Sequence, residues 1–221
     1  MSTAHIEKID YDAEAPGSTP SSPAPPPPLS VTLGQPAPAG MFAFAGTVLL
    51  LALYNLNAGG VDAPNVLVGM LVFAGGMAMT LVSMWEIARG NTLFATCFLT
   101  FTTFWLSYSA VLIPSFGVME AFAATPEQIP KALGIYLFVW FITISCLIPG
   151  VIGKSLLFTA LLSAGAIAVL FLACGMYTQT KAVSIVGNCL LLIMSALAYY
   201  IGVAGLLASD PNGSAFSLPL F

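Results

Sequence analysis

The side chains of this sequence that could contact a small polar solute are mainly hydroxyls on one apolar stretch. Thr92, Thr96, Thr100, Thr103 and Ser107 recur at spacings of 4, 4, 3 and 4 residues, which places all five hydroxyls on one face of a helix. Such a face indicates a polar lining for a solute, hydroxyls that bond to carbonyls one turn back, or a seam between two helices. The spacing alone leaves all three interpretations open.

Amides and one carboxylate lie near the ends of the apolar stretches. Asn55, Glu86 and Asn91 are close to such ends, and Asn188 lies inside one. Because polar groups at membrane depth are costly and often mark a pathway, we take Asn55, Glu86 and Asn91 as candidates for substrate contact. Glu86 and Arg89 also lie close enough to a membrane surface to be a simple hydrated pair.

The same residues exclude several classes of site. The one histidine, His5, lies in the polar N-terminal stretch, so the apolar part cannot hold a histidine-based catalytic triad or a histidine-rich metal site. The middle of each apolar stretch lacks Asp, Glu, Lys and Arg, which excludes a carboxylate relay. We predict no catalytic residue, no metal and no cofactor. Five Lys and Arg residues are too few to neutralise a phosphate backbone, so we also expect no nucleic-acid partner.

The elements that must position these residues are transmembrane helices. Of the 221 residues, 58% are hydrophobic and 6% are charged, a composition that fits a membrane protein and no soluble class. Each apolar run is long enough to cross a hydrocarbon core of ~30 Å as a helix. The six runs cover approximately residues 39–58, 64–85, 92–113, 131–150, 154–176 and 182–207. The sequence therefore predicts an all-α membrane protein, a six-transmembrane-helix bundle over residues 36–208.

The two ends of the chain differ from this bundle. Residues 1–35 are polar and proline-rich, which predicts a disordered N-terminal tail, and residues 209–221 form a short C-terminal tail. An even number of spans places both tails on one side of the membrane. Lys8 and the acidic character of the N-terminal tail favour a cytoplasmic N-terminus, and we expect the plasma membrane as the location.

A set of motifs follows the chain in a fixed order. Gln35-Pro36-Ala37-Pro38-Ala39-Gly40-Met41 stands at the start of the first span. The later motifs are Ala63-Pro64-Asn65, Trp85-Glu86, Gly90-Asn91-Thr92, Phe104-Trp105-Leu106-Ser107, Ile113-Pro114-Ser115-Phe116-Gly117 and Gly134-x-Tyr136-x-x-x-Trp140. This ordered set resembles the acetate uptake transporter family, which includes microbial succinate-acetate permeases and fungal ammonia/acetate outward transporter proteins, and it is closer to the fungal branch.

The resemblance implies a homohexamer in which each subunit has its own pore with a narrow hydrophobic constriction. By position it implies that Phe44 and Phe101 contribute to this constriction, with a third contribution from residues 163–165. The signature residues are Gln35, Pro36, Ala37, Pro38 and Gly40. Together with the polar candidates, the expected substrate contacts are Phe44, Asn55, Glu86, Asn91, Thr92, Thr96, Thr100, Phe101 and Phe104.

The chain also departs from the family pattern. The family has Asn, Leu and Leu where this chain has Gln35, Ala39 and Met41, and it has Tyr where this chain has Phe101, which lacks the hydroxyl.

The resemblance implies a membrane transporter or channel-like carrier for acetate and similar short monocarboxylates, with or without a coupled proton, in a lipid membrane. The alternatives are ammonia or ammonium export and a transport-inactive membrane sensor or scaffold.

Overall fold

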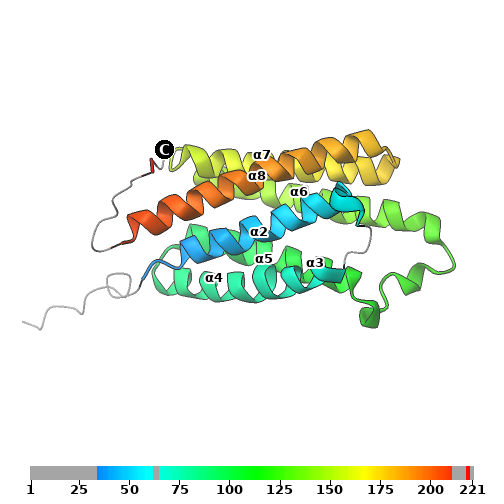
Figure 1. The fold of residues 1–221 in the computed structure, drawn as a ribbon, viewed down its shortest axis with the longest axis horizontal. Helices are drawn as coiled ribbons and strands as arrows, with labels where there is room; N and C mark the ends of the chain where they lie inside the picture. The colour runs from blue at the N-terminus through cyan, green and yellow to red at the C-terminus, as the bar shows by residue number, and fades with distance from the viewer. Residues whose placement is uncertain (1–33, 62–64, 211–217, 220–221) are drawn as a thin grey trace, which may run out of the picture.

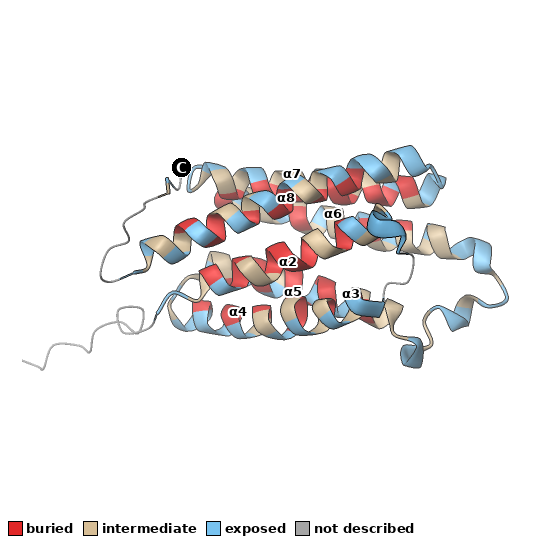
Figure 2. Cartoon of the chain, in the orientation of Figure 1, coloured by how far each residue is buried: buried red, intermediate tan, exposed pale blue. Residues whose placement is uncertain are grey.

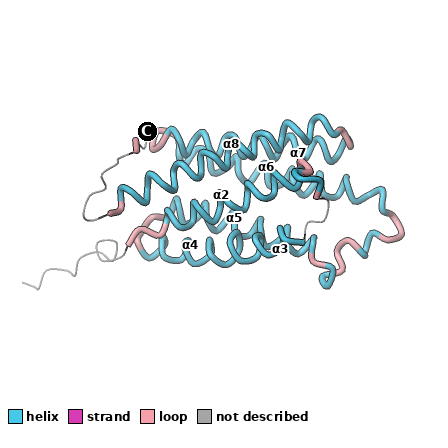
Figure 3. Tube along the Cα trace, viewed as in Figure 1, coloured by secondary structure: helices cyan, strands magenta, loops and turns pink. Residues whose placement is uncertain are grey.

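The computed structural model describes residues 34–61, 65–210 and 218–219. All regular secondary structure in this described part is helical (Figure 3). The predicted N-terminal tail over residues 1–35 lies outside it except for Gly34 and Gln35. Most of the predicted C-terminal tail lies outside it as well.

Six helical segments of the described part are long and apolar enough to cross a membrane. They are α2 (Ala37–Asn55), a composite second span (Asn65–Ala88), α5 (Thr92–Leu112), a fourth span that contains α6 (Ile129–Val151), α7 (Leu156–Thr178) and α8 (Lys181–Ala208). The six-helix prediction is confirmed, and the ends differ from the sequence estimate by a few residues. The largest difference is at the start of the fourth span, and the next largest are at the ends of the first and second spans, at Asn55 and Ala88.

Prolines and glycines explain where the helices begin and end. Proline fits the first turn of a helix because no N–H partner is lost there, and α2 and α6 both have proline at this position. Gly90, Gly117 and Gly153 each have a positive φ of 68–77° in the turns that follow helices. Ser155 begins α7 by accepting a hydrogen bond from the Phe158 N–H at 3.3 Å.

The second span changes its helical winding in the middle. α3 (Asn65–Met70) continues into a π-helical segment, η2 (Leu71–Ala78), which continues into α4 (Met79–Ala88). Gly75 lies against Trp105 of α5, and a Cβ atom at Gly75 would lie 2.6 Å from the Trp105 Cγ. Glycine is therefore required for η2 to approach α5 this closely.

The helices form two groups that meet at α2. α6 packs on α7, α7 on α8 and α8 on α2, whereas α5 packs on α4 and η2. Figure 1 shows α2 between these groups, and Figure 2 shows buried residues gathered where α2, α7 and α8 face one another. α5 and α6 meet at few positions. In the most apolar stretch of the fourth span 17% of the residues are buried, against 56% in that of α2. Much of α6 is therefore available to lipid or to another subunit.

Candidate functional site

One face of α2 lines three hollows that follow one another along the bundle. Residues 38, 41, 44, 48, 51 and 55 recur at helical spacing, and all of them line one of these hollows. The first hollow adjoins the start of α2, the second lies at its middle and the third lies at its end. A single helix face therefore traces a route from one end of the bundle to the other.

The two end hollows each contain a lysine. The Lys154 vestibule has a volume of about 240 Å³ and is lined by Gln35, Ala37, Pro38, Met41, Phe94, Lys154, Ser155, Phe158, Ile201 and Gly205. The Lys181 vestibule has a volume of about 520 Å³ and is lined by Asn55, Leu56, Asn57, Pro130, Gly175, Met176, Gln179, Lys181, Ser184, Ile185 and Asn188. Because Gln35 and Gly205 share the first vestibule, α2 begins and α8 ends at the same end of the bundle.

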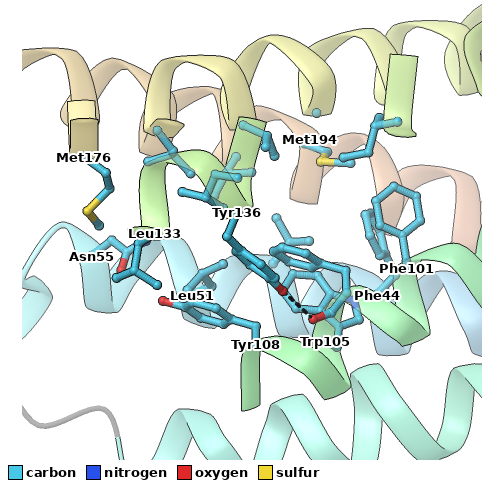
Figure 4. A pocket seen from close by; sticks show the side chains of 18 residues that line it. Phe44, Leu51, Asn55, Phe101, Trp105, Tyr108, Leu133, Tyr136, Met176 and Met194 are labelled. Carbon is cyan, nitrogen blue, oxygen red and sulfur yellow. Dashed lines mark hydrogen bonds between the residues drawn. The ribbon is translucent and has the colours of Figure 1, made fainter. Parts of the chain in front are cut away.

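The central cavity lies between these vestibules and is mostly apolar. α2, α5, α6, α7 and α8 all contribute to its lining (Figure 4). Its volume is about 50 Å³, several times the ~10–15 Å³ that one water molecule needs. Asn55 and Met176 line both the cavity and the Lys181 vestibule, so these two spaces adjoin.

Aromatic rings close the cavity toward the Lys154 vestibule. The ring centroids of Phe44 and Phe101 are 4.6 Å apart, and Phe44 also lies 6.3 Å from Trp105. On the vestibule side, Phe94 stacks on Phe158 with centroids 4.7 Å apart. Phe44, Phe101 and Phe104 all line the cavity. Of these three rings, Phe44 and Phe101 contact each other.

Of residues 163–165, where a third contribution to the constriction is expected, Gly165 of α7 lines the cavity. The space beside this glycine is filled by Met194 of α8, and a Cβ atom at Gly165 would lie 2.9 Å from the Met194 Sδ. Figure 4 shows Met194 beside Phe101. A methionine from α8 therefore occupies the position next to the two phenylalanines, in a place that sequence reasoning assigned to α7.

The signature residues shape the start of this route. Gln35, Ala37 and Pro38 line the Lys154 vestibule. Gly40 instead faces the interior, where an added Cβ atom would lie 2.7 Å from the Phe98 ring and 2.8 Å from Val82. The absence of a side chain at Gly40 lets α2 approach α4 and α5, and this places Phe44, one turn later, against Phe101.

Asn55 is the polar candidate that lies on the route. Its Nδ2 donates to the Asn188 Oδ1 at 2.9 Å, and the Asn188 Nδ2 donates to the Ser184 carbonyl at 2.8 Å. This pair of amides links the end of α2 to α8 at the boundary between the central cavity and the Lys181 vestibule. The sequence places Asn188 inside an apolar stretch, and the structure explains it as the partner of Asn55.

Glu86 and Asn91 lie away from the three hollows. Glu86 is 2% exposed, and its Oε2 accepts a hydrogen bond of 2.7 Å from the Asn91 Nδ2. Arg89 donates to the Gly34 carbonyl at 2.8 Å. In the described structure Glu86 and Asn91 therefore join α4 to the start of α5 rather than line a pathway.

The hydroxyl stripe also lies outside the three hollows. Thr92 and Thr96 are exposed and Thr100 is half-buried, and none of the three lines the cavity or a vestibule. The Thr96 hydroxyl donates to the Thr92 carbonyl at 2.7 Å, and Thr103 donates to the Thr100 carbonyl at 2.7 Å. The opposite phase of α5, with Phe94, Phe101, Trp105 and Tyr108, faces the route instead.

Sequence reasoning missed two tyrosines of the cavity. Tyr108 and Tyr136 line it, and their rings stack with centroids 6.5 Å apart. Tyr136 belongs to the motif Gly134-x-Tyr136-x-x-x-Trp140, whose spacing by itself indicates no role in substrate contact. Tyr108 follows Phe101 by seven residues, which is two helical turns, so the aromatic spacing on α5 was the signal that could have found it.

The chain matches a known family over most of its length. The family model described as "GPR1/FUN34/yaaH family" matches residues 18–221. Accumulation of dyads protein 2 of Saccharomyces cerevisiae is 34% identical over 84% of this chain and 65% of its own length. Ammonia transport outward protein 2 of the same yeast is 34% identical over 78% of this chain and 61% of its own length. The chain thus spans slightly less than two thirds of the length of these yeast relatives.

A solved structure extends the likeness to the fold. The structure titled "Structure of the bacterial acetate channel SatP" superposes with a TM-score of 0.74 at 25% identity, and it covers 86% of this chain and 99% of that chain. The acetate transporter protein patA of Aspergillus clavatus is 31% identical over 88% of this chain and 80% of its own length. With its six membrane-spanning helices and the match over residues 18–221, this integral membrane protein belongs to the GPR1/FUN34/yaaH family.

Proposed function

We propose that the protein is a membrane transporter or channel-like carrier that passes acetate and similar short monocarboxylates along the route between its two lysine vestibules. The continuous lining by one face of α2 supports this proposal, because both vestibules and the central cavity share that face. Relatives named for acetate transport and for an acetate channel support the choice of substrate.

The charges along the route favour an anion over ammonium. Among the described residues that line the three hollows, Lys154 and Lys181 are cationic and none is Asp or Glu. Lys154 lies just before α7, and Lys181 is the first residue of α8, so each lysine adds its charge to the positive end of a helix. An acetate ion is attracted at both ends of the route, whereas an ammonium ion is repelled.

The test is flux of labelled acetate into proteoliposomes that contain the purified chain, at acid and neutral pH, with protein-free vesicles as the baseline. Acetate flux above the baseline is the expected result, and unlabelled propionate should compete with it. Flux of methylammonium without flux of acetate would support the ammonium alternative. Acetate entry that acidifies the vesicles beyond the diffusion of acetic acid would add proton coupling to the proposal.

The assembly and its placement are part of the same proposal. α6 and the hydroxyl face of α5 are largely uncovered in one subunit, and hydroxyl residues often join helices within membranes, which supports a homohexamer with one route in each subunit. Light scattering of the purified protein in detergent tests whether its mass is that of six subunits.

We place the protein in the plasma membrane with a cytoplasmic N-terminus. An N-terminal tag that antibodies reach only after the cells are permeabilised would support this orientation.

A further inference from the structure

The central cavity contains two tyrosine hydroxyls whose hydrogen bonding differs. Tyr108 and Tyr136 come from α5 and α6, and their rings lie nearly parallel, with an interplanar angle of 19°. The Phe104 ring of α5 stacks on both tyrosine rings, with centroids 5.9 Å from Tyr108 and 6.1 Å from Tyr136. Since this stacking fixes both rings, the position of each hydroxyl is fixed as well.

The hydroxyl proton of Tyr136 is already used. Its Oη lies 2.7 Å from the Ser107 Oγ and 3.3 Å from the Phe104 carbonyl, the latter contact drawn as a dashed line in Figure 4. Ser107 itself can donate to the Phe104 carbonyl at 3.0 Å. Each hydroxyl has one proton. If Tyr136 donates to Ser107, then Ser107 donates to the Phe104 carbonyl; if Ser107 donates to Tyr136, then Tyr136 donates to that carbonyl. In either case both protons are used, and none remains for a ligand in the cavity.

The Tyr108 hydroxyl is different, because it has no hydrogen-bond partner among the residues that the structure describes. Figure 4 shows it pointing toward the end of the cavity where Asn55 and Met176 lie. The Asn55 amide uses one of its two N–H groups to bond Asn188, which holds it in place and leaves the second N–H. The two free donors thus lie at the same end of a mostly apolar cavity.

We propose that Tyr108 and Asn55 form an inner binding site for the carboxyl group of a short monocarboxylate, an inference that rests on the proposed transport function. The Tyr108 hydroxyl faces the cavity without a partner among the described residues, so its proton is available to an oxygen ligand that enters. The carboxyl group accepts hydrogen bonds from Tyr108 and Asn55. Its short alkyl group lies against Leu51, Leu133 and Met176, which line the same end of the cavity.

This site has the properties that rapid passage requires. Its donors are neutral, and the nearest lysine of the route, Lys181, lines the vestibule and not the cavity. An ion that leaves the vestibule exchanges water for two hydrogen bonds without meeting a fixed charge that would retain it. Asn55 lines both spaces, so it contacts the substrate during entry, and Tyr108 binds it further inside.

The experiment is acetate flux through proteoliposomes with the Tyr108→Phe protein, which removes only the hydroxyl. Hydrogen bonds to charged groups are among the strong ones, so we expect the acetate concentration at half-maximal flux to rise about tenfold. Tyr177→Phe is the matched control, because Tyr177 is an exposed tyrosine on α7 outside the route. It should leave the half-saturating concentration unchanged.

A second measurement separates loss of the donor from a change of shape. Acetamide has nearly the shape of acetate but no charge. Both acetamide and unlabelled acetate compete with labelled acetate, and the Tyr108→Phe change should weaken competition by acetate more than competition by acetamide. Equal half-saturation in the original and Tyr108→Phe proteins would overturn the inner site while leaving acetate transport intact. Absence of acetate flux in the original protein would instead overturn the proposed function.

Discussion

Phe44 of α2 and Phe101 of α5 lie ring to ring, with centroids 4.6 Å apart and planes tilted by 56°. They are 2% and 6% exposed, and together they close the central cavity toward the Lys154 vestibule. This ring contact joins the two groups of helices, because α2 packs mainly on α8, whereas α5 packs mainly on α4 and η2. The cavity is therefore closed by two aromatic rings, and neither ring has a polar atom that could bind a passing ion.

Shortening either ring should widen the route. We expect Phe101→Ala or Phe44→Ala to admit larger monocarboxylates such as butyrate and to raise leak, because the closing ring is lost. A Phe→Ala change in a packed interior typically costs about 3–5 kcal/mol, so flux must be measured per assembled protein. Leu99→Ala on the exposed side of α5 is the control, and unchanged size selectivity of the Phe variants relative to it would remove these rings from the route.

Gly165 and Met194 should show coupled effects on flux. In Gly165→Ala the added methyl group meets the Met194 Sδ at 2.9 Å, so the thioether must move, and the cavity that both residues line offers space for it. We expect acetate flux to fall, and the double variant with Met194→Ala to recover it. A double variant as slow as Gly165→Ala would mean that Met194 does not obstruct the route.

Lys181 and Glu86 should differ in their effect on the salt dependence of flux. A unit charge ~10 Å away in water contributes about 0.4 kcal/mol, so Lys181→Gln should slow acetate entry about twofold at low ionic strength and less at high ionic strength. Glu86→Gln keeps an oxygen acceptor for Asn91 and lies away from the hollows. It should leave the salt dependence unchanged. Faster acetate entry in Glu86→Gln, limited to low salt, would instead place Glu86 at an entrance of the route.

The hydroxyl stripe should affect assembly more than flux. Thr96→Val and Thr103→Val remove hydroxyls from the exposed face of α5, and interhelical hydrogen bonds within membranes are worth about 0.6–2 kcal/mol. We expect the oligomer to dissociate at lower detergent concentration while flux per intact oligomer stays the same. Reduced flux per oligomer, measured together with unchanged dissociation, would assign these hydroxyls to the pathway.

The sequence by itself determined the six spans and the residues at their ends. Apolar length, proline and glycine act locally, so α5 begins and ends within one residue of the predicted range 92–113. The family likeness also identified Phe44 and Phe101, which lie together in the structure. These features depend on neighbouring residues or on a shared pattern and need no knowledge of how the helices pack.

Only the tertiary structure decided which face of each helix is turned inward. On α5 the threonine stripe and the aromatic stripe have the same helical period, so periodicity cannot choose between them. Packing against α2 and η2 turns Phe101, Trp105 and Tyr108 toward the interior and leaves Thr96 and Thr103 outside. The unbonded hydroxyl of Tyr108 follows from that rotation, because Ser107 lies against Tyr136 and the Tyr108 side chain extends into the cavity.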